Sequence, residues 1–526
     1  MKTGFLLAMV LFLGRAFGQS DDAAKYAAFI TGTDLQKHLT IIAGDAMEGR
    51  ETGTEGQRKA AAYIESQFKL LGLKTAKGLD GYQQFYPLYQ DSMISCELKI
   101  NGAPLEFGKD YISPVNNNET GNFNSSEMVF VGYGIEDKNY NDYAALNVSG
   151  KTVVFFSGEP KADGIYLVSG TKKASDWSAF QSLPMKLALA AKKGAAGVLM
   201  INPTQESFNQ RAADNSKRTG VVFPRGGAEK KANFAVISHA MAARILAANA
   251  DSLISRARTG RNFSSTDYVS TPLVVAFSFT RYRNTINASN VIGIMEGTDK
   301  KDEYVFLTGH YDHLGKHDGK IYYGADDDGS GTCNVIEMAG AFAKAKAAGK
   351  GPRRTIVFMT VSGEEKGLWG SEYYSDHPLY PLDKTTVDLN TDMIGRVDTE
   401  RKTADTLNYV YVVGHDKISS DLPVINEEVN KKYTGLKLDY KFDDPNDNER
   451  IYYRSDHYNF ARKGVPVLFF YDGMLKADYH KPTDTVDKIN WSLYEKRARM
   501  IFHTAWVIAN RENMLVRDKP LTEGTR

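Results

Sequence analysis

The stretch Tyr304-Val-Phe-Leu-Thr308-Gly-His310-Tyr-Asp312-His313 is a short apolar run that ends in imidazole and carboxylate side chains. A brief run of large apolar residues bounded by a glycine is typical of a buried strand. Strand-like and helix-like segments alternate after it, which indicates a sheet with helices on both faces. In such a sheet the chemically active residues lie in loops at the carboxyl ends of strands. We therefore expect an α/β fold with His310 at one strand end.

The alternation from about Val274 onward can be placed by residue range. Apolar runs predict strands at 304–308, 354–361, 387–390 and 465–471, and helical spacing predicts helices at 331–347 and 368–374. Upstream, Leu35, Leu39 and Ile42 recur at helical spacing, and a second helical pattern ends at Gly72. A turn-rich loop separates these two helices.

Further acidic and imidazole residues gather at the ends of the expected strands. They occur in Ala325-Asp-Asp327-Asp-Gly-Ser-Gly331 and in Ser362-Gly-Glu364-Glu365, and are followed by Asp392 and His480. With His310 they offer two imidazoles and three carboxylates as metal ligands, and Glu364 and Asp312 remain as helpers. A two-metal hydrolytic site needs this inventory, because each cation requires its own ligands, one carboxylate bridges and another accepts a proton from water.

On these motifs the chain resembles the co-catalytic zinc exopeptidases of clan MH, metallopeptidase family twenty-eight. Members of that clan include bacterial leucyl-type aminopeptidases and glutamate carboxypeptidase. The resemblance extends from Gly49-Arg-Glu-Thr-Gly-Thr54 to Tyr479-His-Lys-Pro-Thr-Asp-Thr485. It implies a three-layer α/β/α catalytic domain of the phosphorylase/hydrolase-like type with a mostly parallel, mixed sheet.

The resemblance also implies a role for each ligand of two Zn²⁺ ions per chain. Asp327 would bridge both ions, His310 and Asp392 would complete the shell of one, and Glu365 and His480 that of the other. The ligand set alone would also accept other divalent ions, such as manganese or cobalt. The choice of Asp327 within the Asp triplet rests on the family pattern, because spacing alone does not decide it.

The resemblance assigns Glu364 and Asp312 to catalysis rather than to the metals. Glu364 would be the general base for a metal-bridging hydroxide, and Asp312 would orient the His310 ring. Adjacent residues cannot share one face of a strand, which fits different roles for Glu364 and Glu365. His313 and His317 are interpreted as residues near the site or on the surface rather than as ligands.

The segment Arg454-Ser-Asp456-His457 resembles a Ser-Asp-His segment beside the substrate pocket of the family. We therefore expect Arg454, Asp456 and His457 near the pocket. A purely structural loop is the alternative.

Four segments are expected along the 526 residues. They are a signal peptide at 1–18, the first part of the catalytic domain at 19–123, an inserted domain at 124–268 and the main catalytic part at 269–526. The inserted block contains no ligand candidate. It resembles a β-rich protease-associated (PA) domain through Asn141–Lys151 and the helical stretch from Lys186, which implies a role in shaping or covering the active-site entrance.

Composition narrows the class of protein. Hydrophobic residues make up 42% and charged residues 25% of the chain, as in ordinary globular proteins. The formal net charge of +1 gives no indication of a nucleic-acid partner. A basic start followed by the apolar run Phe5–Leu13 is typical of a secretory leader and too short to span a bilayer, so we expect a secreted or periplasmic protein without stable membrane insertion. Two cysteines exclude a disulfide scaffold, and a reduced, packed thiol is expected for Cys333.

The expected function is hydrolysis of the N-terminal peptide bond of peptides by a secreted di-zinc aminopeptidase. Within the same clan, a glutamate-carboxypeptidase-like enzyme or a dipeptidase is the main alternative. Acyl transfer of the glutaminyl-cyclase kind and a non-catalytic, receptor-like protein are further ones. The sequence leaves open the side-chain preference, the length of the peptides and the oligomeric state.

Overall fold

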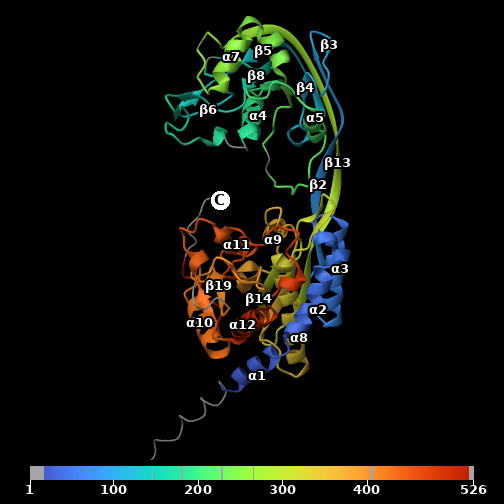
Figure 1. Cartoon of the computed structure of the whole chain (residues 1–526), viewed down its shortest axis with the longest axis vertical. Coiled ribbons are helices and arrows are strands. Elements are labelled where there is room, and N and C mark those ends of the chain that lie inside the picture. Colours follow the sequence, from blue (N-terminus) through green and yellow to red (C-terminus); the bar gives the residue numbers. More distant parts are fainter. Residues whose placement is uncertain are drawn as a thin grey trace, which may run out of the picture. The chain divides into compact units, whose positions relative to one another are not determined.

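The computed structural model describes residues 17–519 apart from 145, 179–181, 227–228, 265 and 403–406. All but the last two residues of the expected signal peptide lie outside the described residues. The chain divides into two compact units (Figure 1). Unit 1 combines the chain up to Tyr86 with the chain from Asn287 onward, and unit 2 is Pro87–Ile286.

Unit 1 contains a mixed, mostly parallel sheet. Its strands run in the order β20-β19-β21-β18-β14-β17-β13. Strand β14 pairs in parallel with both β17 and β18, and β21 pairs in parallel with β18, whereas β13 and β19 run antiparallel to their neighbours β17 and β21. The bounds are β13 Ser270–Met295, β14 Lys300–His310, β17 Arg354–Val361, β18 Thr385–Thr391, β19 Tyr409–Val413, β20 Lys437–Asp439 and β21 Val467–Tyr471.

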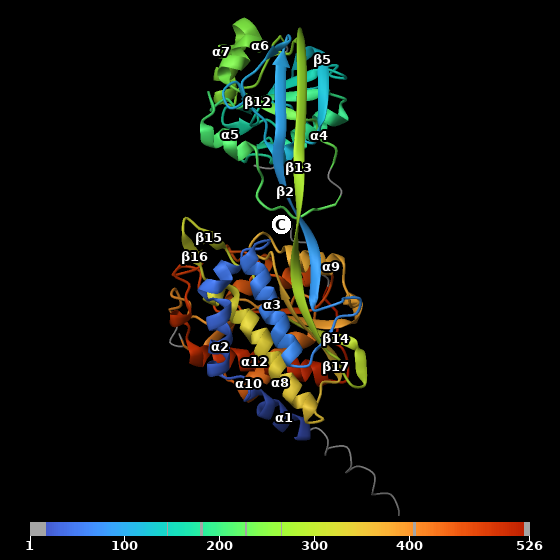
Figure 2. The ribbon, with the colours of Figure 1, turned by 90° about the vertical axis from the view of Figure 1, so that its right-hand side faces the viewer.

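Helices cover both faces of this sheet, as the alternation of strand and helix predicts. Along β14, Val305 and Leu307 belong to one hydrophobic core, whereas Phe306 between them belongs to another. The first core includes α1 Phe17–Ala27, α2 Gly32–Ile42, α3 Glu55–Leu70, α8 Gly331–Ala347, α10 Asp421–Tyr433 and α12 Trp491–Asn510. The second includes α9 Trp369–Asp376 and α11 His457–Ala461. Figure 2 views unit 1 from the side of α3 and α8. The expected three-layer α/β/α architecture is therefore confirmed.

The strands of unit 2 form a sheet region with a parallel centre. Its strands run in the order β5-β8-β11-β12-β4, with β13 antiparallel to β5 and β4 antiparallel to β12. The strand bounds are β4 Tyr111–Ile112, β5 Gly121–Phe130, β8 Thr152–Phe156, β11 Gly197–Ile201 and β12 Phe234–Ile237. The helices are α4 Ser182–Lys192, α5 Gln210–Ser216, α6 His239–Leu246 and α7 Ala250–Arg258.

The remaining strands are short or belong to hairpins. They are β1 Lys74–Thr75, β2 Gln83–Ile100, β3 Ala103–Pro104, β6 Glu136–Asp137, β7 Tyr140–Asn141, β9 Lys161–Ala162, β10 Ile165–Tyr166, β15 Gly315–His317 and β16 Lys320–Tyr322.

Unit 2 is wider at both ends than the inserted block predicted at 124–268. At its start, Tyr111 and Ile112 pair with β12, so they belong to the sheet of this unit. At its end, residues 270–279 of β13 pair with β5. Short, mixed runs carry little sequence signal of which strand they will join, so the bounds 124–268 of the inserted domain stay a prediction.

Among the described helices, none combines the length and apolar character needed to cross a membrane. Cys333 is a free, buried thiol in α8, as expected, and Cys96 is also free.

Candidate metal centre

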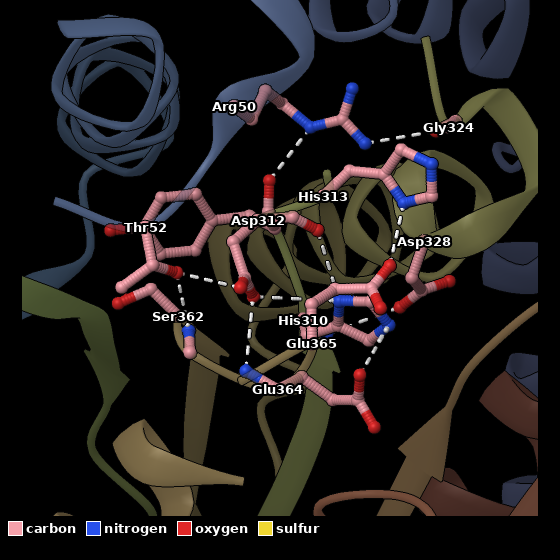
Figure 3. A network of polar contacts seen from close by, with 12 residues as sticks. Arg50, Thr52, His310, Asp312, His313, Gly324, Asp328, Ser362, Glu364 and Glu365 are labelled. Carbon is pink, nitrogen blue, oxygen red and sulfur yellow. Dashed lines mark hydrogen bonds and ion pairs between the residues drawn. The ribbon is translucent and has the colours of Figure 1, made fainter. Parts of the chain in front are cut away.

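The predicted ligands come together at the carboxyl ends of the parallel strands of unit 1. His310 is the last residue of β14, and Asp392 directly follows β18. Glu364 and Glu365 lie just after the end of β17. Asp327 lies in the irregular turn that precedes α8, and His480 lies in the loop after β21. Figure 3 shows part of this cluster.

The two outer members of the Asp triplet face the backbone rather than the histidines. Asp328 accepts hydrogen bonds from the N–H groups of His310, Gly331 and Met393, at 3.1, 2.7 and 3.0 Å. Asp326 accepts one from the N–H of Gly395 at 2.8 Å. Each bond is to a buried backbone donor that needs a partner. Asp326 and Asp328 therefore hold the surrounding loops together.

Asp327 faces two histidines with its two carboxylate oxygens. Its Oδ1 lies 3.2 Å from His310 Nε2, and its Oδ2 lies 3.2 Å from His480 Nε2. Asp392 Oδ1 lies 3.6 Å from His310 Nε2. Glu365 Oε2 lies 2.9 Å from His480 Nε2. The five predicted ligands thus form two groups that share Asp327.

The orientation of the His310 ring leaves one nitrogen facing the carboxylates. Its Nδ1 lies 3.1 Å from the carbonyl oxygen of Asp312, a contact that places the ring proton on Nδ1. The Nε2 lone pair then points toward Asp327 and Asp392. An imidazole held in this way by a backbone oxygen is typical of a metal ligand.

Asp312 and Thr52 connect this strand end to the loop that carries Glu364. Thr52 Oγ1 donates to Asp312 Oδ2 at 2.6 Å and accepts from the N–H of Gly363 at 2.9 Å (Figure 3). Asp312 Oδ1 accepts from the N–H of Glu364 at 3.2 Å and lies 3.6 Å from His310 Nδ1. Thr52 and Asp312 are both buried. Asp312 therefore positions both His310 and Glu364.

Arg50 fixes the neighbouring loops from the same segment of chain. Its guanidinium is fully buried and donates to the carbonyl oxygens of Ile42, Tyr311, Tyr323 and Gly324. These bonds join the loop after β14 to the turn before α8. Arg50 and Thr52 lie within the quoted Gly-Arg-Glu-Thr-Gly-Thr motif, but sequence reasoning assigned neither of them a role. The motif itself was the available signal.

His313 lies in the group around Glu365. From the sequence it was expected to lie near the site or on the surface and not to be a metal ligand. The side chain is fully buried, and Nδ1 lies 2.7 Å from Glu365 Oε1 and 3.9 Å from Asp327 Oδ2. Only its position shortly after His310 could have signalled this. His317, in contrast, is half exposed and lies against the carbonyl oxygen of Leu314, in agreement with its surface assignment.

Glu364 lies beside the two groups without belonging to either. Its Oε2 is 3.8 Å from His310 Nε2. Burial raises the pKa of the Glu364 carboxyl well above its ordinary value, and the neighbouring carboxylates of Glu365 and Asp392 raise it further. Cations bound next to it would lower that pKa again. A carboxyl group in this position can both accept and return a proton near neutral pH.

A small cavity opens next to Glu364. Three acids line it, Asp327, Glu364 and Asp392, together with Arg454, Ser455 and Tyr479 and the apolar side chains of Met393, Ile451, Phe469, Tyr471 and Leu475. Tyr479 Oη accepts a hydrogen bond from Arg454 Nη2 at 3.1 Å. Asp456 and His457 are not among the lining residues and are buried. Of the three residues expected at the pocket, the structure brings Arg454 to it.

A second cluster of possible ligands consists of His415, Asp416 and Asp443. Lys417 Nζ lies 3.2 Å from Asp443 Oδ1 and 3.5 Å from Asp416 Oδ1. The ammonium group already pairs with both carboxylates, so we assign no cation to this cluster.

Comparison with known proteins places the cluster in a family context. Residues 290–505 match peptidase family M28, and they include all five predicted metal ligands. The chain is 28% identical over 215 residues to a probable leucine aminopeptidase of Arthroderma otae, covering 40% of this chain and 55% of that protein. It is 24% identical over 353 residues to a probable glutamate carboxypeptidase of Zea mays, covering 65% of this chain and 47% of that protein. The chain thus spans about half the length of these curated relatives.

Among solved structures, the fold is similar to that of an aminopeptidase from Aneurinibacillus sp. strain AM-1. The TM-score is 0.50 at 19% identity, covering 95% of this chain and 100% of the other. At this level of identity the likeness concerns the fold alone.

Proposed function

We propose, from the membership of residues 290–505 in peptidase family M28, that this protein is a zinc-dependent exopeptidase and acts as an aminopeptidase on peptides. The observation that carries the proposal is the placement of Asp327. Its two oxygens face separate histidines, and Glu364 lies alongside. This is the arrangement that a bridging carboxylate and a general base need.

The residues present fit two divalent cations. His310 Nε2, Asp327 Oδ2 and Glu365 Oε1 are buried and make no hydrogen bond within the described part of the chain. Buried polar atoms without a partner are costly, so an ion at this position would satisfy them. His310, Asp327 and Asp392 would hold one cation, and Asp327, Glu365 and His480 the other. When bound, such cations polarise a scissile carbonyl and allow water to act as a nucleophile near neutral pH.

Side chains of the protein itself transfer the protons and stabilise the developing charge. Glu364 takes a proton from the attacking water and returns it to the leaving amine. Asp312 holds the backbone of Glu364 through its N–H, and Thr52 holds Asp312. Tyr479 lines the cavity and is held by Arg454, so its hydroxyl can donate to the negative charge that develops on the carbonyl oxygen.

The cavity favours an aminopeptidase over a carboxypeptidase. A carboxypeptidase needs a free basic group, whereas Arg454 is already bonded to Tyr479 and has Nη1 3.7 Å from Glu449. The apolar lining, which includes Met393, suits an N-terminal residue with an apolar side chain.

The deciding experiment compares three forms of one peptide with an N-terminal leucine. The zinc-loaded protein is given the free peptide, its N-acetylated form and its C-terminally amidated form, and the released amino acids are identified. We expect cleavage at the first bond of the free and amidated peptides and none of the acetylated one. Cleavage of the acetylated peptide at its last bond would instead assign a carboxypeptidase, as in the name of the maize relative. No cleavage of any form would refute the exopeptidase proposal.

The Thr52→Val variant tests how the base is positioned. Valine has nearly the same shape but removes the bond to Asp312 and leaves the N–H of Gly363 without its acceptor. Loss of such a partner costs about 10–100-fold in activity or metal affinity. We expect kcat for the leucyl peptide to fall by about that factor. Thr54→Val is the matched control, since within the described residues the Thr54 hydroxyl bonds only the carbonyl of Glu51, at 2.6 Å. Equal kcat values in both variants would contradict the positioning role.

A further inference from the structure

His313 is a buried imidazole that the two predicted ligand groups do not explain. The side chain has no exposed surface, and within the described residues neither ring nitrogen makes a hydrogen bond. Burial of polar nitrogen atoms without partners costs free energy, and native proteins rarely tolerate it. A bound group that contacts at least one ring nitrogen would remove this cost.

The Nδ1 atom of His313 faces the group around Glu365. It lies 2.7 Å from Glu365 Oε1 and 3.9 Å from Asp327 Oδ2. On the other side, His480 Nε2 lies 2.9 Å from Glu365 Oε2 and 3.2 Å from Asp327 Oδ2. Two imidazoles thus approach the same pair of carboxylates. The corners of a tetrahedral zinc site with bonds of about 2.0–2.1 Å lie about 3.3 Å apart, a spacing similar to these.

A hydrogen bond to Glu365 does not account for the position of the ring. The 2.7 Å contact is short enough for one, but within the described residues neither His313 Nδ1 nor Glu365 Oε1 has a hydrogen bond of accepted geometry. Two buried atoms that lie this close without such a bond fit ligands of a common ion. On the other side of the carboxylate, Glu365 Oε2 lies 2.9 Å from His480 Nε2.

The surrounding chain holds the His313 ring in this place. A Cβ atom at Gly324 would lie 2.4 Å from His313 Cγ, so the absence of a side chain there lets the turn pack against the ring. The N–H of His313 donates to the carbonyl of Arg50 at 3.3 Å, and Arg50 Nη2 donates to the carbonyl of Gly324 at 2.9 Å. Figure 3 shows Arg50, Gly324 and the His313 ring together. The ring is pre-positioned rather than free to turn away.

We propose that His313 is a ligand of the cation held by Asp327, Glu365 and His480, so that this position has four protein ligands. The inference rests on the proposed metal-dependent function. The other position, formed by His310, Asp327 and Asp392, then has three. Closed four-ligand zinc sites are typical of tightly retained ions, whereas three-ligand sites keep a position open for water or substrate. The two cations therefore differ in affinity, and the one beside His310 is lost first.

Zinc titration of the metal-free full chain tests the proposal. Competition with a chelator of known affinity gives the two dissociation constants for wild type, His313→Asn and His317→Asn. Asparagine can still donate a hydrogen bond to Glu365 but lacks the imidazole. We expect the tighter dissociation constant of His313→Asn to rise by more than about 100-fold, beyond the 10–100-fold typical of lost outer partners. The weaker one, and both constants of His317→Asn, should stay near the wild-type values.

A measurement on the wild type keeps the proposal testable even if His313→Asn fails to fold. With one equivalent of cobalt(II), the visible absorption of the native chain reports how many ligands surround the tighter position. A four-ligand, imidazole-rich spectrum that changes in folded His313→Asn supports the proposal. A rise below about 100-fold in the tighter constant, or an unchanged cobalt spectrum, overturns it. Wild-type protein that binds zinc in two steps but cleaves no peptide would refute only the proposed function.

Discussion

Glu364→Gln is expected to retain zinc and to lower kcat by about 10²–10⁴-fold, the contribution typical of a general base. Glutamine keeps the size and shape of the side chain but cannot accept a proton. Glu364 Oε2 lies 3.8 Å from His310 Nε2, and the carboxylate lines the cavity rather than joining either ligand group. The variant should therefore bind a leucyl peptide with little change in KM, because the loss affects the chemical step.

Two measurements distinguish loss of the general base from loss of zinc. Metal analysis should find as much zinc in Glu364→Gln as in the wild type, and single-turnover kinetics should locate the loss in the cleavage step. Glu337→Gln is a control for the same substitution at a partly buried glutamate, since Glu337 pairs with His38 at 3.1 Å away from the ligand groups. Wild-type kcat in Glu364→Gln would exclude Glu364 as the base. Loss of zinc would instead make it a ligand.

The sequence predicted those parts of the fold that depend on local pattern. The helix expected at 331–347 and the strand expected at 354–361 coincide with α8 and β17. Both are buried along most of their length, so their apolar residues give a clear pattern in the sequence. Because parallel strands end at one edge of the sheet, His310 and Asp392 could be expected near each other despite the distance along the chain.

The roles of neighbouring acids could not be predicted from pattern. Asp326 and Asp328 differ from Asp327 only in what they contact, and their partners include Gly395 and Met393, far away in the sequence. The choice of Asp327 came from the family resemblance. The geometry gives this choice a physical reason, because the carboxylates of Asp326 and Asp328 already accept hydrogen bonds from backbone N–H groups of other loops.

His313 and Thr52 show a second limit. No spacing rule selects a histidine shortly after a predicted ligand histidine, or a threonine in a turn-rich loop. Their significance depends on tertiary contacts, namely Glu365 for His313 and Asp312 for Thr52. The boundaries of unit 2 had the same difficulty, since strand partners of short runs are set by the whole sheet.

Asp327→Asn should disable the centre more completely than loss of any ligand that serves one cation. The amide keeps one oxygen but replaces the other with an NH₂ group, which has no lone pair to offer a metal. Since Oδ1 faces His310 and Oδ2 faces His480, one of the two groups loses its shared ligand whichever way the amide turns. We expect zinc content to fall to one ion or fewer. Loss of the several kcal/mol that a metal gives to the transition state corresponds to a decrease in kcat/KM of about 10³-fold or more.

The same variant should change how zinc affects stability. A ligand that binds only the folded state at 100 times its Kd stabilises that state by about 2.7 kcal/mol, so zinc should raise the melting temperature of wild type and raise it less in Asp327→Asn. Asp416→Asn is the matched control, because Asp416 belongs to the cluster in which Lys417 already supplies the positive charge. That control should keep wild-type zinc content, activity and melting behaviour. Two tightly bound zinc ions in Asp327→Asn would contradict a bridging carboxylate, and zinc loss in Asp416→Asn would show that the second cluster also binds a cation.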